Sequence, residues 1–169
     1  TGIADAYFDS IPVLYITGQV NSYEYKYDKP IRQQGFQETD IISIVKPITK
    51  YAAFVDDAKN LRYELEKAIH IATTGRKGPV LLDIAMNVQR TDINPDELFG
   101  YKDDVNPIEE KFDLTEIVDL FSKSKRPMVL LGAGCIGDEV QKHLENFIFN
   151  HEIPVVTSLM GRGAIDETY

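Results

Sequence analysis

"TTGRKGPVLLDI", residues 73–84, contains the strongest fold signal in the chain. Its second half, 79–84, is an almost continuous apolar run, which is typical of a strand buried on both faces of a parallel sheet. A helical pattern precedes it: Asp56 or Asp57 can cap the helix, and Gly75 can end it. One apolar stripe follows the helical period, formed by Leu61, Leu65, Ala68, Ile69 and Ala72. A helix that leads into a buried strand in this way indicates an α/β fold.

The segments before this helix extend the same pattern. "PVLYITG" (12–18) is a second apolar run and predicts another buried parallel strand. The end of a helix precedes it and breaks at Asp9 and Ser10. A short helix over 39–47 and a short strand or extended link over 49–55 follow. The loop between Gln19 and Glu38 is long enough to have a function of its own.

The pattern changes after this unit. Residues 87–113 contain two Asn-Pro pairs and many charges, which indicates a linker, with one helical turn at 95–99. A second unit follows, with helices over 113–125 and 138–150 and parallel strands at 126–134 and 153–158. We therefore predict an α/β fold of parallel-sheet layered units. The predicted domains are 1–88 and 113–169, joined by a linker at 89–112.

Composition excludes several classes of protein. The 169 residues include 18 basic and 27 acidic side chains, and the net charge of −9 argues against nucleic-acid binding. No run of about 18 apolar residues could span a membrane. The single Cys135 excludes an internal disulfide and fits a reducing cytoplasm. The three histidines are spread along the chain, so no His/Cys metal cluster is expected.

A glycine-rich turn is the first candidate site. "VLLGAGCIGDEV" (129–140) places Gly132, Gly134 and Gly137 in G-x-G-x-x-G spacing between a strand and a helix. Such glycines let the backbone approach a pyrophosphate at the helix N-terminus. A nicotinamide site would want an acidic residue at the end of the strand at 153–158, and none is there. The pattern leaves three readings open: a flavin or other nucleotide, NAD, or a structural tight turn.

The other candidates are weaker. Arg76, next to Lys77, either complements a helix C-terminus or reaches a phosphate or flavin with its fixed fork of donors. The alternating tyrosines of "YEYKYD" (23–28) predict an edge strand or interface ribbon, with packing favoured over ligand contact. Cys135 is expected to be a small packed side chain, not a nucleophile.

Four stretches together resemble one known family. "GIADAYFDSIPVLYITGQV", "GFQETD", "GRKGPVLLDI" and "PVVTSLMGRGA" are similar to the thiamine-diphosphate-dependent acetolactate synthases, in this order and at nearly the family spacing. The resemblance implies that 1–88 is the later part of a pyrimidine-binding domain. It also implies that 113–169 is the first part of a central domain that is associated with FAD.

The resemblance assigns roles to individual residues. Phe36 and Gln37 match a phenylalanine–glutamine pair that lines the active site, so they are the predicted catalytic residues. Arg76 matches an arginine that contacts FAD. The resemblance also implies flavin contacts for Gly132, Ala133, Gly134, Ser158 and Leu159. Gly18 and Gln19 are predicted cofactor contacts on a separate ground, because they end the first strand at the edge where α/β sheets bind ligands. No metal ligand is predicted in this chain.

The implied activity is a carboligation. The enzyme would decarboxylate pyruvate and transfer the two-carbon unit to a second carbonyl, with thiamine diphosphate, Mg²⁺ and FAD, in branched-chain amino acid biosynthesis. The implied partners are a small 2-keto acid and other copies of the chain, in a homodimer or homotetramer with the site at the subunit interface. The family's activating glutamate and its metal motif are expected before Thr1 and after Tyr169, so we expect this chain alone to be inactive.

The chain departs from the family at one place. Asn21 stands where the family usually has proline, and "DIAMNV" (83–88) puts Met86 where it usually has lysine. The loop is also longer, by about the length of "YKYDKP" (25–30). These differences suggest a changed acceptor. The alternatives are a carboligase acting on an aldehyde or keto-sugar, or a decarboxylase or oxidase relative. In different classes, they are an NAD-dependent dehydrogenase and a non-catalytic regulatory or scaffolding relative.

Overall fold

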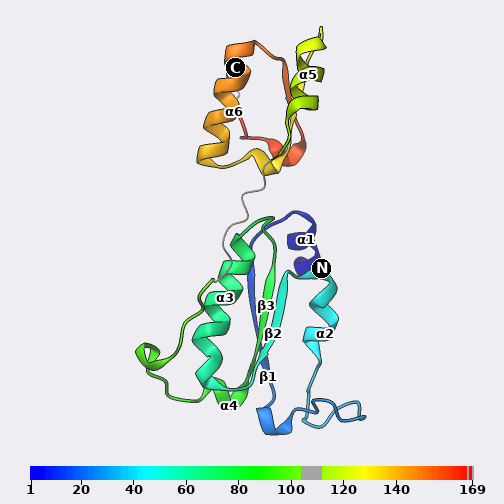
Figure 1. Cartoon of the computed structure of the whole chain (residues 1–169). Helices are drawn as coiled ribbons and strands as arrows, with labels where there is room; N and C mark the ends of the chain where they lie inside the picture. The colour runs from blue at the N-terminus through cyan, green and yellow to red at the C-terminus, as the bar shows by residue number, and fades with distance from the viewer. Residues whose placement is uncertain (104–111, 167, 169) are drawn as a thin grey trace. The chain divides into compact units, whose positions relative to one another are not determined.

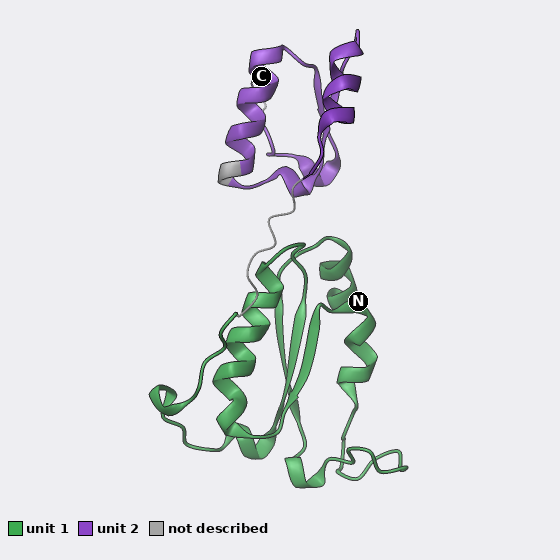
Figure 2. Cartoon of the chain, in the orientation of Figure 1, with its two compact units in different colours: residues 1–106 green, residues 107–169 purple. Residues whose placement is uncertain are grey.

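The computed structural model describes residues 1–103, 112–166 and 168. It divides into two compact units, 1–106 and 107–169 (Figure 2). Both units are α/β with parallel sheets, as the sequence predicts. The central part of the predicted linker, 104–111, lies outside the described residues. Within the described residues, no helix has the length and apolar character needed to cross a membrane.

The first unit is a three-stranded parallel sheet between helices (Figure 1). The strands are β1 (Leu14–Gln19), β2 (Tyr51–Val55) and β3 (Val80–Ala85), in the order β1-β3-β2. The helix α3 (Leu61–Thr73) lies on one side of the sheet, and α1 (Gly2–Phe8) and α2 (Ile41–Val45) lie on the other. In register, Leu14 and Tyr51 both face Val80.

Burial on both faces is confirmed for the central strand β3 and is wrong for the edge strand β1. All six positions of β3 are buried, because the strand has a neighbour on each side and helices over both faces. The run at 12–18 does form a parallel strand, but the prediction that it is buried on both faces is wrong. Ile16 is 58% exposed, because β1 lies at an edge of this sheet.

Helix α3 contributes apolar side chains that pack against the sheet to form the core of the first unit. Ala68 and Ala72 are buried against the sheet, and Leu61 and Leu65 pack beside them. Ile69 was expected in the same stripe, but it is 52% exposed and lies off the buried face. The helix starts after a 3-10 turn, η3 (Ala58–Asn60), which the Asp57 carboxylate caps by accepting the Lys59 N–H at 2.9 Å.

The segment after β3 folds back along α3. It forms α4 (Met86–Gln89) and η4 (Pro95–Glu97), the helical turn expected at 95–99. The Glu66 carboxylate accepts the Tyr101 N–H at 2.7 Å, and the ring centroids of Tyr63 and Phe99 lie 5.5 Å apart. Residues up to 103 therefore pack on the first unit, and the domain boundary at 88 stays a prediction.

The second unit has a two-stranded parallel sheet, β4 (Val129–Leu131) and β5 (Val155–Thr157). The helices α5 (Thr115–Lys123) and α6 (Asp138–His151) and the 3-10 turns η5 (Ala133–Cys135) and η6 (Leu159–Gly161) complete it. Its core contains Leu131, Ile148, Ala164 and Ile165, and Cys135 packs against it. This position agrees with a packed side chain.

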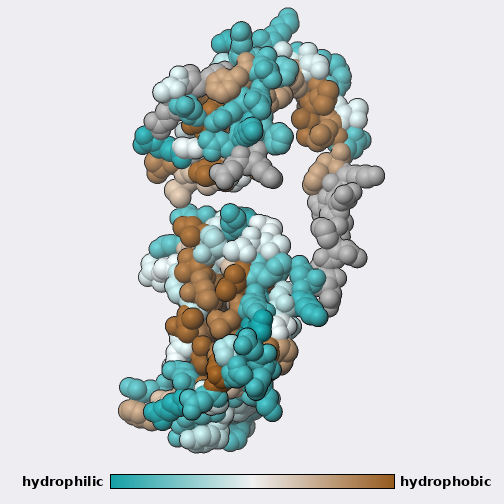
Figure 3. Space-filling view, turned by 90° about the vertical axis from the view of Figure 1, so that its left-hand side faces the viewer, coloured by the Kyte–Doolittle hydropathy of each residue, from teal (hydrophilic) through white to brown (hydrophobic). Residues whose placement is uncertain are grey.

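Hydrophobic side chains also reach the surface. In the view of Figure 3 they gather in a continuous band along the first unit. Large exposed apolar residues of this unit include Ile16, Ile44 and Ile69.

Candidate functional site

The loop from β1 to α2 is held by one buried carboxylate, Glu38, which is 8% exposed. Its Oε1 accepts the Lys26 N–H at 2.9 Å, and its Oε2 accepts those of Gln34 at 2.7 Å and Gly35 at 3.1 Å. Burial opposes ionisation of this group, but the three backbone donors outweigh it and lower the pKa of Glu38. No sequence pattern predicts a role for Glu38, although it lies within "GFQETD" (35–40).

The predicted catalytic pair lies in a tight turn inside this loop. The Glu38 N–H donates to the Gly35 carbonyl at 3.2 Å, which closes the turn around Phe36 and Gln37. Gln37 has φ of +65°, a conformation that costs a non-glycine residue energy and is often found at functional sites. Phe36 is 86% exposed and Gln37 is also exposed. The turn therefore presents both side chains to solvent at the carboxyl edge of the sheet, where α/β folds bind ligands.

Gly35 lets the turn pack closely against the start of the loop. A side chain at this position would put Cβ 3.0 Å from the Val20 Cγ1 and 3.1 Å from the Glu24 carbonyl oxygen, tighter than ordinary contact. Gly35 is buried between these residues. Its lack of a side chain lets the turn pack against the start of the loop.

A buried polar network joins β1 to β3 and reaches the end of the loop at Thr39. The Asp83 carboxylate, 2% exposed, accepts the Thr17 hydroxyl and the Gln19 amide, both at 2.8 Å. The Gln19 amide also donates to the Thr39 carbonyl at 2.6 Å, and its oxygen accepts the Val20 N–H at 3.0 Å. These contacts give the Gln19 side chain a structural role, and its predicted contact with a cofactor stays a prediction.

Gly18, next to it, is exposed at the same edge of the sheet. A Cβ there would lie 3.2 Å from the Gln89 side-chain nitrogen. Gly18 is therefore exposed but has the Gln89 side chain close by, and its predicted contact with a cofactor also stays a prediction.

The tyrosines of "YEYKYD" do not form a strand. Residues 22–24 are a 3-10 turn, η1 (Ser22–Glu24), so the predicted edge strand is wrong. Tyr25 and Tyr27 instead pack on Phe54, with ring centroids 4.5 and 6.2 Å away, because the chain turns at Tyr27, where φ is +46°. The Tyr27 hydroxyl donates to Asp56 at 3.0 Å, and burial together with this carboxylate raises the pKa of Tyr27 to about 12.

The two segments in which we expect departures from the acetolactate synthase pattern touch each other. The Asn87 side-chain oxygen accepts the Ser22 N–H at 2.8 Å, and the Asn87 amide donates to the Ser22 hydroxyl at 3.1 Å. The Met86 N–H donates to the Val20 carbonyl at 3.4 Å. The sequence change after β3 is therefore in contact with the sequence change after β1.

Arg76 precedes β3 and lies at the amino-terminal end of the strands, opposite the end that carries the Phe36 turn. Its Nε donates to the Ser10 hydroxyl at 2.9 Å, and Ser10 has φ of +58°. Arg76 borders a pocket of about 370 Å³, whose other lining residues are Tyr7, Phe8, Lys50 and Lys77. The Lys50 ammonium donates to the Ile71 and Thr74 carbonyls. The cations of Arg76 and Lys77, beside two aromatic rings, suit an anion that carries a planar ring system. This pocket lies at the amino-terminal end of the parallel strands and the Phe36 turn at their carboxyl end, so β3, roughly 17 Å long, lies between the two ends.

The predicted cofactor residues of the second unit come together where β4 and β5 end. The Ser158 N–H donates to the Leu131 carbonyl at 2.8 Å, directly before the Gly132 turn. Gly161 lies so close that a Cβ there would be 2.3 Å from this carbonyl oxygen. The sequence reading gave Gly161 no role of its own.

The glycines of that turn are not needed for packing. A Cβ on Gly132 or Gly134 would meet nothing within 4 Å. Ala133 is exposed and Leu159 is 81% exposed. The small side chains therefore leave open space over the strand ends, which fits the approach of a diphosphate to the backbone.

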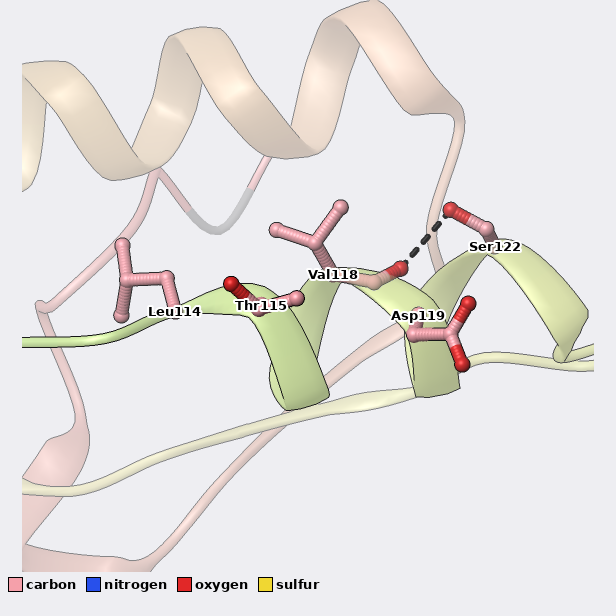
Figure 4. Close-up of a pocket in the computed structure, with 5 residues that line it drawn as sticks. All are labelled: Leu114, Thr115, Val118, Asp119 and Ser122. Atoms are coloured by element: carbon pink, nitrogen blue, oxygen red, sulfur yellow. Dashed lines mark hydrogen bonds between the residues drawn. The ribbon is translucent and has the colours of Figure 1, made fainter.

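A further surface pocket lies on α5, lined by Leu114, Thr115, Val118, Asp119 and Ser122 (Figure 4). The Ser122 hydroxyl donates to the Val118 carbonyl at 2.7 Å, within the helix. No predicted site residue lies in this pocket. Over residues 1–103, 112–166 and 168, no group of three or more His, Cys, Asp or Glu side chains could hold a metal ion.

Comparison with known proteins identifies the class. Residues 114–169 match the family described as "Thiamine pyrophosphate enzyme, central domain". The second unit therefore carries sequence of the central domain of thiamine pyrophosphate enzymes.

Relatives that match almost the whole chain are acetolactate synthases. The chain is 35% identical to acetolactate synthase 2, chloroplastic, of Nicotiana tabacum, over 97% of this chain and 24% of that protein. It is 36% identical to the acetolactate synthase large subunit of Corynebacterium glutamicum, over 100% of this chain and 26% of that protein. For the acetolactate synthase of Mycobacterium bovis the values are 38%, 100% and 27%. The chain thus spans about a quarter of the length of these relatives.

Proposed function

We propose that the chain is part of a thiamine-diphosphate-dependent carboligase of the acetolactate synthase type. The complete enzyme decarboxylates pyruvate and transfers the two-carbon unit to a second carbonyl. The family match of residues 114–169 and the relatives that match 97–100% of the chain support this function.

The observation that carries the proposal is the turn at 35–38. It exposes Phe36 and Gln37 at the carboxyl edge of the sheet, and a buried carboxylate fixes the loop around it. Phe36 walls the substrate pocket, and the Gln37 amide donates to an oxygen on which negative charge develops. A glutamine suits this task because its amide orients a substrate without titrating near neutral pH.

Thiamine diphosphate, when bound, supplies the electron sink for the decarboxylation. Its Mg²⁺ ligands lie outside this chain. Of the predicted contacts, Gly18 fits best, because it is exposed at the carboxyl edge, whereas the Gln19 side chain is engaged within the sheet. The enzyme is cytoplasmic and a homodimer or homotetramer, with the active site at the subunit interface.

FAD is the second proposed cofactor, with a structural role. Arg76, in the cationic pocket with its aromatic rings, contacts it through the first unit. In the second unit its diphosphate lies against the open turn, with contacts from Gly132, Ala133, Gly134, Ser158 and Leu159. In the complete protein, Arg76→Ala weakens FAD binding, measured by flavin fluorescence on titration, and Arg90→Ala serves as the control. Equal affinity in both variants contradicts this assignment.

The test of the activity uses the complete protein with thiamine diphosphate, Mg²⁺ and pyruvate. We expect CO₂ release, and a decrease of about 100-fold in kcat for Gln37→Ala if its amide stabilises the developing charge. Gln33→Ala removes the same side chain from an exposed position in the same loop and is the matched control. Absence of CO₂ release, or an equal effect of the two variants, contradicts the proposal.

The alternatives differ in products. A decarboxylase relative releases the aldehyde, and an oxidase relative consumes oxygen. An NAD-dependent dehydrogenase built on the glycine turn would bind NADH, whereas bound flavin without NADH binding excludes it. The family membership of residues 114–169 gives the dehydrogenase no support.

A further inference from the structure

A polar pocket lies at the carboxyl edge of the first unit, with a volume of about 500 Å³. All three strands lead into it: side chains that follow β1, β2 and β3 line it together. The lining includes Ser22, Tyr27, Asp56, Asn60, Asn87 and Thr91. Its size is in the range of small-molecule sites, and its place in the sheet is where α/β folds bind ligands.

The lining selects a kind of ligand by its charge. The described residues around the pocket include two carboxylates, Asp56 and Asp57, but no Lys, Arg or His. A 2-keto acid bound here would place its carboxylate beside these two, and like charges repel. A neutral ligand avoids this repulsion.

The hydrogen-bonding groups favour a ligand with several hydroxyls. Carboxylates accept, carboxamides both donate and accept, and a hydroxyl does both, so the pocket can pair with alcohols that also donate and accept. The Asn60 carboxamide does not cap the helix that starts beside it, and Asn60 and Thr91 are exposed. The Asn60 carboxamide is therefore accessible to a ligand. The Thr91 hydroxyl donates to the Asn87 carbonyl at 2.7 Å, so it can accept a hydrogen bond from a ligand.

The pocket is also built from the segments in which we expect departures from the acetolactate synthase pattern. Tyr27 comes from the extra length of the loop, and its hydroxyl is fixed by Asp56. Asn87 is fixed by Ser22 from the other side. Met86, 39% exposed, stands where the family usually has a lysine, so this position supplies no cation.

We infer that this pocket is the acceptor subsite of the enzyme and binds a neutral, polyhydroxylated aldehyde or ketone of the sugar class. The inference rests on the carboligase function proposed above and specifies its second substrate. Pyruvate loses CO₂, its two-carbon unit forms a bond to the acceptor carbonyl carbon, and the carbonyl electron pair moves to oxygen, which takes up a proton. No oxidant or reductant is needed. The pocket holds the hydroxyl-bearing part of the acceptor.

The experiment offers the complete protein two acceptors in competition. With pyruvate as donor, D-glyceraldehyde is the neutral probe and 2-oxobutyrate the anionic one, and the products are separated by mass spectrometry. We expect the glyceraldehyde adduct to dominate. Asn60→Ala and Thr91→Val each remove hydrogen-bonding capacity from the pocket and raise the KM for glyceraldehyde about tenfold. Asn150→Ala, an exposed asparagine on α6, leaves it unchanged.

Each other outcome overturns the inference in a distinct way. If CO₂ is released but acetolactate or the 2-oxobutyrate adduct dominates, the subsite is wrong and the carboligase function stands. If the adduct forms but both pocket variants keep the wild-type KM, the acceptor binds elsewhere. If no CO₂ is released from pyruvate, the proposed function fails, and the subsite fails with it.

Discussion

The Glu38 Oε2 accepts the Gly35 N–H at 3.1 Å, while the Glu38 N–H donates to the Gly35 carbonyl at 3.2 Å. These two hydrogen bonds close a turn that contains only Phe36 and Gln37 between its ends. The proposed active-site pair is thus held by its immediate neighbours in sequence. The same carboxylate also fixes Lys26 and Gln34, so it organises most of the loop.

Glu38→Gln should loosen this loop. A carboxamide keeps one acceptor oxygen, but it places an N–H group against backbone donors and removes the charge that strengthens the bonds. We expect a loss of about 1.5–3 kcal/mol in the free energy of unfolding, measured in urea. Asp28→Asn, an exposed acid-to-amide change in the same loop, should have little effect. Equal losses in both variants would show that Glu38 has no special role.

The loop should also respond to acid. Because the folded-state pKa of Glu38 is lowered, its stabilisation is present in full above the unfolded-state pKa, about 4.3 for Glu. It is lost as pH falls through the lower folded-state pKa. NMR shifts of the Lys26, Gln34 and Gly35 amide protons should follow this titration together. In Glu38→Gln the three amides should no longer titrate, and a persistent transition would assign it to another group.

Gln37→Gly should make the protein more stable and less active. Its φ of +65° is strained for a side chain with Cβ, so glycine relieves the strain, partly offset by the entropy of glycine in the unfolded chain. We expect a net gain of up to about 1 kcal/mol in urea unfolding, with loss of CO₂ release in the complete protein. Gln33 does not have a positive φ, so Gln33→Gly should be destabilising instead. A loss of stability in Gln37→Gly would show that the positive φ of Gln37 does not destabilise the folded state.

Asp83→Leu should be among the most damaging single changes in the first unit. It leaves the buried donors of Thr17 and Gln19 without an acceptor, and each unsatisfied group costs about 1–3 kcal/mol. The double variant Asp83→Leu/Thr17→Val removes one of these donors and should recover part of the loss. Additive losses in the double-mutant cycle, measured by chemical unfolding, would rule out the coupling.

Alanine substitution at two glycines of the second unit should affect the stability of the protein differently. Gly161→Ala forces Cβ against the Leu131 carbonyl, at 2.3 Å in the present backbone, so we expect destabilisation of about 1–3 kcal/mol. Gly134→Ala adds a methyl group where nothing lies within 4 Å and should leave unfolding nearly unchanged. In the complete protein the same Gly134→Ala should weaken FAD binding. If the FAD affinity is unchanged, the flavin does not bind at this turn.

The predicted strands and helices follow from local rules. The apolar run at 79–84 and the stripe of α3 gave the parallel sheet and its helix, because burial on both faces or on one face leaves a direct pattern in the sequence. Ile16 and Ile69 were misjudged for the same reason. Apolar character alone does not tell whether a neighbouring element covers the side chain.

The sequence by itself determined the α/β class and the resemblance to thiamine pyrophosphate enzymes, since both depend on residue order and short-range periodicity. The role of the Phe36–Gln37 pair stays a prediction. The tertiary structure alone decided which distant residues meet: Glu38 with Lys26, Asp83 with Gln19, and Asn87 with Ser22. Hydrogen bonds of this kind join a side chain to a backbone N–H or to another side chain that strand pairing or loop closure brings near, and no local pattern records them. The pocket at the carboxyl edge exists for this reason, because three strands that are separate in sequence end side by side.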